Sequence, residues 1–329
     1  MIKTNPYSNY PLPLYNYFIS TYAKFLLSGK CLSFPRAIQI QTQSRCNARC
    51  EICPYRITSK ELAQGVMQDE LFSKISDELT AEKKPPMLMF ALHNEPLLDK
   101  RIFERVKRVK SKNPGCYCIV PTNAELLDTF SQTEIEESGV DQINVNLGAR
   151  TQETYERIHT GLDYERVTKN VNRLVSDETM RQKLQIMFVL NKENAHEAQP
   201  ASRYWKQRGV RVKVVELNNR AGSLATYDSL SLEKSHPARS PLLRGWKSLM
   251  SGARRTIGCE LPFYQMDILF NGDVIICSCD WKRATLIGNV KTSSIRSIWN
   301  SERANEIRRL ILRKRYEQIS ACEDCSQVK

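Results

Sequence analysis

Between residues 37 and 215 the chain alternates short apolar runs with amphipathic helical patterns, and no other feature restricts its fold as much. The apolar runs have the length of buried strands, and the segments between them carry apolar residues at helical spacing. The expected strands cover residues 37–42, 87–92, 116–120, 143–147, 184–190 and 210–215, and the expected helices cover residues 69–79, 102–109, 132–137, 164–175 and 195–206. Because parallel strands need crossover connections, these units predict an α/β fold with a parallel sheet, curled into a partial barrel or laid open.

Polar residues follow the predicted strands. They include residues 93–96, 121–123, 144–146, 191–194 and 218–222. The carboxyl ends of parallel strands meet at one edge of a sheet, so these groups are expected to form a ring around a barrel mouth, as a polar cofactor requires. Each segment alone is also explained by turn chemistry, because Asn and Gly favour turns.

Three cysteines, Cys46, Cys50 and Cys53, follow the first predicted strand with the spacing CxxxCxxC. Three thiolates on one short loop can hold three irons of a 4Fe-4S cluster, which leaves the fourth iron open to bind and reduce a small molecule. A structural zinc ion needs four closed ligands, and no nearby Cys or His completes such a set. The spacing therefore favours an iron-sulfur site with a catalytic role over zinc.

A different pattern begins after Gly222. A linker rich in Ser, Arg and Pro is followed by expected strands at 263–270 and 274–278. Asn271 and Gly272 between them are a strong hairpin signal, and helices are expected at 293–300 and 302–313. This part of the chain predicts a small β-hairpin plus helix module.

Five cysteines lie in this carboxyl-terminal region: Cys259, Cys277, Cys279, Cys322 and Cys325. Cys277 and Cys279 are two apart on a predicted strand and share one of its faces. Four of the five thiols can close a second iron-sulfur site and leave one over. A zinc site built from the same ligands remains an alternative.

The 11 cysteines cluster in tight groups, and the chain shows no secretory segment. These features favour metal binding over disulfides and predict a reducing, cytoplasmic setting. No apolar run reaches the length of a membrane span. Residues 15–27 can form a short amphipathic helix, for which packing against the domain is favoured over membrane-surface attachment.

The formal net charge is +13, which indicates an anionic partner or substrate. The densest basic stretch is residues 237–256, and further basic residues occupy the expected last helix. Solvated faces explain such runs more simply than a phosphate-binding or nucleic-acid surface does, so nucleic acid is not the expected partner.

These motifs together resemble the radical S-adenosylmethionine (radical SAM) enzymes that carry a carboxyl-terminal SPASM/twitch extension, of the twitch-type dehydrogenase subgroup. CxxxCxxC resembles their cluster motif. The later resemblance rests on Cys259, Gly272, Cys277 and the CxxC formed by Cys322 and Cys325. It implies an amino-terminal aromatic segment (1–36), a radical SAM partial TIM-like (β/α)6 barrel (37–222), a basic linker (223–258) and a SPASM/twitch auxiliary cluster domain (259–329).

The resemblance also implies the cofactors. The open iron of the first cluster would bind S-adenosyl-L-methionine, and an electron from a flavodoxin- or ferredoxin-like reductant would cleave it to a 5'-deoxyadenosyl radical. One auxiliary 4Fe-4S cluster would sit on Cys259, Cys277, Cys322 and Cys325.

Cofactor contacts are carried over at Glu95, Asn123, Asn146 and Asn191. Three departures alter the family pattern. His93 and Asn94 replace the glycines of the GGEP motif, Ala124 replaces the glycine of TNG, and Ile52 replaces the aromatic residue common before the third cysteine.

The implied reaction is removal of a hydrogen atom from a carbinol carbon of a small sugar or cyclitol-like substrate, with the auxiliary cluster accepting an electron to give a ketone or aldehyde. Arg220, with Arg254 or Arg255, would orient a hydroxyl or an anionic group of the substrate.

Three alternatives stay open. In an epimerase, Cys279 would return a hydrogen atom to the substrate radical, with Cys116 and Cys118 as weaker donor candidates. Peptide modification is another use of this extension. Binding of RNA or an acidic peptide, with the clusters as structural staples, is least favoured because a staple has no use for an open iron.

Overall fold

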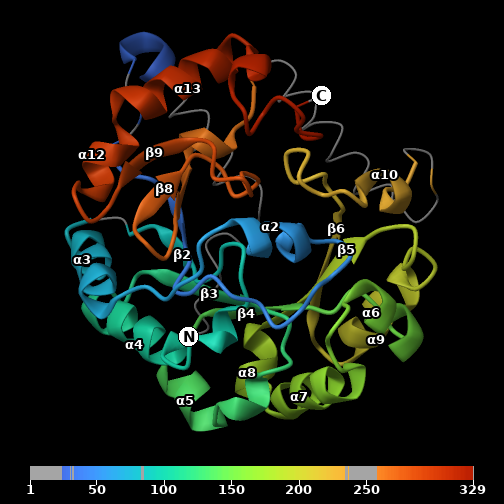
Figure 1. Cartoon of the computed structure of the whole chain (residues 1–329). Helices are drawn as coiled ribbons and strands as arrows, with labels where there is room; N and C mark the ends of the chain where they lie inside the picture. Colours follow the sequence, from blue (N-terminus) through green and yellow to red (C-terminus); the bar gives the residue numbers. More distant parts are fainter. Residues whose placement is uncertain are drawn as a thin grey trace.

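One sheet of nine strands organises the molecule, in the order β6–β5–β4–β3–β2–β1–β7–β8–β9. The computed structural model describes residues 24–29, 31, 33–82, 85–233, 236 and 258–328 (Figure 1). The strands are β1 Ala37–Ile40, β2 Met87–Met89, β3 Tyr117–Thr122, β4 Gln142–Asn146, β5 Leu184–Leu190, β6 Arg211–Glu216, β7 Gln265–Ile268, β8 Asp273–Ile275 and β9 Leu286–Asn289. Neighbours from β6 to β7 pair in parallel, whereas β8 and β9 are antiparallel.

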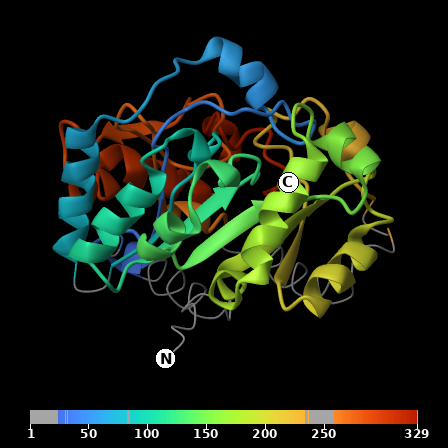
Figure 2. The same cartoon turned by 90° about the horizontal axis from the view of Figure 1, so that it is seen from below.

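Helices α3, α4, α5, α7, α8 and α9 follow one another around the outer side of the parallel strands (Figures 1 and 2). The helices are α2 Tyr55–Glu61, α3 Asp69–Thr80, α4 Ile102–Lys112, α5 Gln132–Glu137, α6 Gln152–Ile158, α7 Tyr164–Ser176, α8 Glu178–Lys183, α9 Ala198–Gln207, α10 Tyr227–Leu230, α12 Ile295–Trp299 and α13 Glu302–Leu312. Short 3-10 turns are η1 Pro96–Leu98, η2 Leu127–Thr129, η3 Leu261–Phe263 and η4 Tyr316–Gln318.

The two faces of the parallel strands differ in polarity. Ile38, Ile40, Ile143 and Val145 belong to the apolar core beneath the helices. Successive strand residues point to opposite faces, so the residues between them face the inside of the curved sheet. Gln142 lies there and donates to Asn144 Oδ1 (2.6 Å). The inner face is therefore partly polar.

The predicted partial barrel is confirmed, because the parallel sheet is open and carries helices on its outer side. The carboxyl-terminal hairpin extends this same sheet, since β7 pairs in parallel with β1 through Ala37↔Gln265 to Ile40↔Ile268. The expected strand 263–270 begins later than predicted. Phe263 belongs instead to η3, because the preceding Pro262 cannot donate a hydrogen bond to a ladder.

Helix α3 joins the carboxyl-terminal elements to the rest of the molecule. Lys74 donates from its ammonium group to the carbonyls of Val290 and Ser293. Glu78 accepts from the backbone N–H of Ile295 at the start of α12 (2.6 Å). The expected N-terminal helix (15–27) lies mostly outside the described residues, and the basic stretch 237–256, with Arg254 and Arg255, lies wholly outside them. None of the described helices is long and apolar enough to cross a membrane.

Candidate metal centre

The loop that carries the first three cysteines runs from β1 to α2 and is fixed by hydrogen bonds at both ends. The N–H of Cys46 donates to the hydroxyl of Tyr55 in α2 (2.8 Å). Arg49 and Glu51 donate from their backbones to the carbonyls of Thr160 and Ile158, just after and at the end of α6. Strand β1 and helix α6 therefore position the loop at the carboxyl ends of the strands.

The three thiols lie within electrostatic range of one another. Burial raises the pKa of Cys46 to about 12, and the neighbouring Cys53 adds to the shift. Burial also raises the pKa of Cys50 well above its usual value, with Cys53 and Cys46 as further causes. Thiolates at such positions need nearby positive charge, which the iron of a cluster supplies. Backbone N–H groups of Ala48 and Tyr55 donate toward the sulfurs of Cys46 and Cys53, as suits thiolate ligands.

His159, which the sequence analysis did not single out, lies beside this loop. Its Nδ1 is 3.5 Å from Cys50 Sγ. Burial lowers the pKa of His159 to about 4, so the imidazole is neutral. Its Nε2 is buried without a hydrogen-bond partner and faces Gly148. No motif links two residues 109 positions apart, so only the fold reveals this contact.

Glu95 joins the ends of β2 and β3. Its carboxylate accepts from Thr122 Oγ1 (2.7 Å), from the N–H of Asn123 (2.8 Å) and from the N–H of Leu97 (3.0 Å). Burial raises its pKa to about 7. Both Glu95 carboxylate oxygens are therefore engaged by the protein, and its cofactor role stays a prediction.

The three predicted asparagines differ in their surroundings. Asn123 donates from Nδ2 to Asn47 Oδ1 in the cysteine loop (2.8 Å), so the structure brings it to the candidate centre. Asn146 is exposed at the end of β4. The Asn191 side chain donates to the Val189 carbonyl (3.0 Å) and accepts from the N–H of Glu193 (2.9 Å), so its amide closes its own turn.

The carboxyl-terminal cysteines also gather in one place. The N–H of Cys279 donates to Cys277 Sγ (3.3 Å). The pKa of Cys277 is raised by its hydrogen bond with Cys279, by burial and by Cys259. Burial raises the pKa of Cys322 to about 12, and Cys325 and Cys279 contribute. Cys259, Cys277, Cys279, Cys322 and Cys325 therefore form a second thiol-rich site, as their spacing predicted.

Thiols are the donors that iron-sulfur clusters use, so the residue types at both sites suit the two expected clusters, although the described side chains are not placed around a single metal position. Among the described residues, no group of three or more His, Cys, Asp or Glu side chains is arranged around one metal ion. Cys116 and Cys118 belong to neither site, since they lie at the start of β3, the opposite end of the strand from the cysteine loop, and Cys116 Sγ donates to the Pro86 carbonyl (3.2 Å).

His93, which follows β2, contacts the second thiol site. Its Nε2 donates to the carbonyl of Ser278 (2.7 Å), and Ser278 lies between Cys277 and Cys279 in the sequence. Its ring stacks on Trp281 with centroids 3.9 Å apart. Burial lowers the pKa of His93 to about 3, so this contact is made by a neutral ring. At this position the backbone has φ 56°, a left-handed conformation that a glycine would adopt without strain.

Arg220 lies in the loop after β6. Leu217 and Leu224 of that loop pack against Ile52 of the first cysteine loop. Asn219 hydrogen-bonds Ser326 beside Cys325. The predicted site residue Arg220 is thus placed between the two thiol sites.

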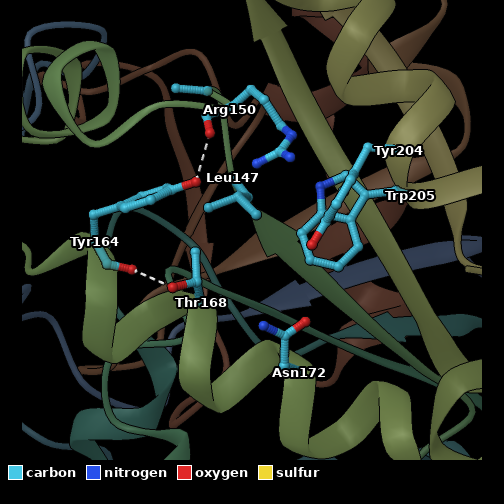
Figure 3. Close-up of a pocket in the computed structure, with 8 residues that line it drawn as sticks. Leu147, Arg150, Tyr164, Thr168, Asn172, Tyr204 and Trp205 are labelled. Carbon is cyan, nitrogen blue, oxygen red and sulfur yellow. Dashed lines mark hydrogen bonds between the residues drawn. The ribbon is translucent and has the colours of Figure 1, made fainter.

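A separate cavity of about 180 Å³ lies between α7 and α9 (Figure 3). Tyr164 donates from its hydroxyl to the Arg150 carbonyl at its rim (2.6 Å). The Arg150 and Arg208 guanidinium groups both lie over the Tyr204 ring. None of the predicted site residues lines this cavity.

Comparisons with known proteins agree with this geometry. Residues 40–203 match the Radical SAM superfamily, and residues 259–326 match SPASM, an iron-sulfur cluster-binding domain. The chain is 27% identical over 326 residues to the "tungsten-containing aldehyde ferredoxin oxidoreductase cofactor-modifying protein" of Pyrococcus furiosus, covering 88% of this chain and 86% of the relative.

A second relative is the "S-adenosyl-L-methionine-dependent 2-deoxy-scyllo-inosamine dehydrogenase" of Niallia circulans. It is 18% identical, covering 88% of this chain and 92% of the relative. Among solved structures, BtrN in complex with AdoMet and 2-DOIA has a TM-score of 0.60 at 18% identity, covering 88% of this chain and 92% of that one. The structural likeness shows a shared fold.

Proposed function

This chain belongs to the radical SAM superfamily and carries a SPASM domain, and from that membership we propose that it oxidises a carbinol carbon of a small sugar or cyclitol-like substrate to a ketone or aldehyde. Cys46, Cys50 and Cys53 would hold the cluster that binds S-adenosylmethionine. An auxiliary 4Fe-4S cluster would be held by Cys259, Cys277, Cys322 and Cys325. When bound, these groups supply two things: a 5'-deoxyadenosyl radical, which removes a hydrogen atom from the substrate, and an acceptor for one electron.

One observation carries the proposal: the hydrogen bond from His93 to Ser278. His93 follows β2 at the mouth of the barrel, and Ser278 lies between two cysteines of the second site. A second thiol site held against the mouth of the barrel is well placed to receive an electron from a substrate bound there. A distant structural site would need no such contact.

The protein's own residues prepare the site. Glu95 and Asn123 hold the strand ends and the cysteine loop in register. Ile52 excludes water from one side of the loop by packing on Leu217 and Leu224. The Niallia circulans relative supports the reaction class, because its name describes a dehydrogenase that acts on a cyclitol amine.

Replacing Cys322 and Cys325 by Ala tests the electron-acceptor role. We expect the double variant to keep cleavage of S-adenosylmethionine and to lose product, because the first site is intact and the second loses two ligands. Iron content should fall by roughly four per chain, from about eight to about four. The measurements are anaerobic iron and sulfide analysis, 5'-deoxyadenosine formation and product detection by mass spectrometry.

Cys31→Ala is the matched control, because Cys31 is buried outside both thiol sites. This variant should retain both iron content and product. Unchanged product in Cys322→Ala/Cys325→Ala would contradict the proposal.

Epimerisation is a second candidate, supported by the fifth thiol at the second site. Cys279 is buried beside Cys277, and a cluster with four thiolate ligands leaves one cysteine over. Turnover in deuterated water separates the two reactions. A ketone or aldehyde without solvent deuterium supports oxidation, whereas solvent deuterium fixed in an unoxidised stereoisomer supports hydrogen return from Cys279.

A further inference from the structure

We infer that Arg220 is an anion-binding residue between the two thiol sites, and that the substrate of the proposed reaction carries a carboxylate or phosphate group that this guanidinium binds. That the bound anion belongs to the substrate rests on the proposed function. The binding site itself is argued from the structure of the loop that follows β6.

The loop is held on both sides. On one side, Leu224 packs against Ile52, and Thr226 Oγ1 donates to the carbonyl of Glu51 (2.5 Å). On the other side, the N–H of Asn219 donates to Ser326 Oγ (3.1 Å), and Ser326 returns a bond from its N–H to Asn219 Oδ1 (2.9 Å). The loop therefore bridges the two cysteine-bearing segments.

Gly222 makes this bridge possible. Its φ is 77°, and a Cβ at this position would lie 2.8 Å from the Cβ of Asp324, within the Cys322–Cys325 segment. Any side chain here would push the loop away from the second thiol site. The close approach thus holds the loop that carries Arg220 against the second thiol site.

The backbone at Arg220 is strained. Arg220 and Ala221 have φ of 50° and 53°, so two consecutive residues with side chains adopt the left-handed conformation. Each such residue costs about 1 kcal/mol or more, and strain of this kind persists where the surroundings enforce it, often at functional sites. A merely solvated arginine would not require it.

Within the described residues, the guanidinium group of Arg220 forms no ion pair with an Asp or Glu side chain. Across the described parts of the chain, no side chain forms an ion pair or hydrogen bond with it, and its Nε is buried without a partner. It lies within electrostatic range of Cys53 in the first site and of His93, which contacts the second site. His93 is a neutral ring whose Nε2 donates to the Ser278 carbonyl, so it does not compete with Arg220 for an anion.

Planar guanidinium groups bind carboxylate and phosphate through paired hydrogen bonds, and a partly buried one without an acid partner is prepared for such a ligand. An oxyanion bound to Arg220 would hold the rest of a small molecule between the first thiol site and the second. A carboxylate or phosphate would pair with this guanidinium more strongly than the hydroxyls of an uncharged cyclitol, because both partners are then charged. The expected substrate is therefore an anionic sugar or cyclitol derivative.

Inorganic phosphate serves as the probe. In the anaerobic holoenzyme with reduced, paramagnetic clusters, phosphate bound at Arg220 should show saturable broadening of its ³¹P resonance. Arg220→Gln should weaken this binding about tenfold or more, because a charge-assisted pair is lost, whereas Arg220→Lys should retain part of it. Arg150→Gln is the matched control, since Arg150 lies by the outer cavity between α7 and α9.

Two results would overturn the inference. The first is equal phosphate binding by the wild type and Arg220→Gln, with iron content and circular dichroism unchanged. The second is a loss of affinity for S-adenosylmethionine in Arg220→Gln, measured without substrate, that is as large as the loss of affinity for phosphate. This result would assign the arginine to the carboxylate of the cofactor. Failure of the oxidation reaction leaves the phosphate result standing, so the two proposals fail separately.

Discussion

At the scale of single residues, the cysteine spacing indicated that the thiols gather at two places, because Cys46, Cys50 and Cys53 share one loop and Cys277 and Cys279 follow one strand; which of them are cluster ligands stays a prediction. His159 could not be predicted in this way, since its contact with Cys50 depends on how α6 packs on the loop. Asn191 shows the opposite outcome: its position at a strand end was recognised, but its amide is engaged in its own turn.

The neutral His159 donates from Nδ1 toward Cys50 when that sulfur is a thiolate ligand. Hydrogen bonds to sulfur stabilise the reduced cluster and raise its potential. We expect His159→Leu to lower the midpoint potential of the first cluster by roughly 40 mV, the equivalent of about 1 kcal/mol for one electron. His159→Asn keeps a donor near the Nδ1 position and should restore most of the shift.

Redox titration followed by electron paramagnetic resonance measures this effect, in the Cys322→Ala/Cys325→Ala background so that only the first cluster is seen. A potential that does not change in His159→Leu would show that the contact leaves the cluster unaffected.

At the scale of elements, the strand–helix alternation predicted β1 to β6 and the helices α3, α4, α5, α7 and α9, because their core-facing residues recur at strand or helical spacing, whereas the short helices α2, α6 and α8 were not predicted. The hairpin signal at Asn271 and Gly272 likewise predicted β7 and β8. The pairing of β7 with β1 was not predictable, since no local pattern states which edge strand a hairpin will join. The polar inner face of the sheet was also missed, although Gln39 and Gln41 alternate with Ile38 and Ile40 in the sequence.

Helix α13 is tied to its neighbours by Arg308, which is fully buried. Its guanidinium donates to the carbonyls of Pro262 (2.9 Å) and Trp299 (2.6 Å) and to Asn305 Oδ1 (2.8 Å). We expect Arg308→Met to lower the free energy of unfolding by about 3 kcal/mol, because buried acceptors lose their donor. Urea unfolding followed by circular dichroism measures it.

The adjacent Arg309 provides the control, because it pairs with the exposed Glu302 on the helix surface. Arg309→Met should change stability by less than about 1 kcal/mol. Similar losses in both variants would show that the buried contacts of Arg308 add nothing specific.

At the scale of the whole molecule, the regions that match the two families share one sheet. The domain boundaries inferred from the sequence stay a prediction, but the hydrogen bonds between β1 and β7 and those from α3 to residues 290–295 couple the regions. We therefore expect one cooperative unfolding transition. Circular dichroism, dominated by the helices of the barrel, and fluorescence of Trp281 and Trp299, measured in a Trp205→Phe/Trp246→Phe background, should give the same midpoint; two separate midpoints would contradict this coupling.

The β1–β7 ladder also has a consequence for electron tunnelling. Strand β1, which precedes Cys46, pairs with β7, and β7 pairs in turn with β8, which precedes Cys277, so backbone hydrogen bonds set the separation of the two thiol sites. That separation does not depend on the number of residues that intervene along the chain. Insertions or deletions between residues 233 and 258 can therefore lengthen or shorten the connection without changing this separation.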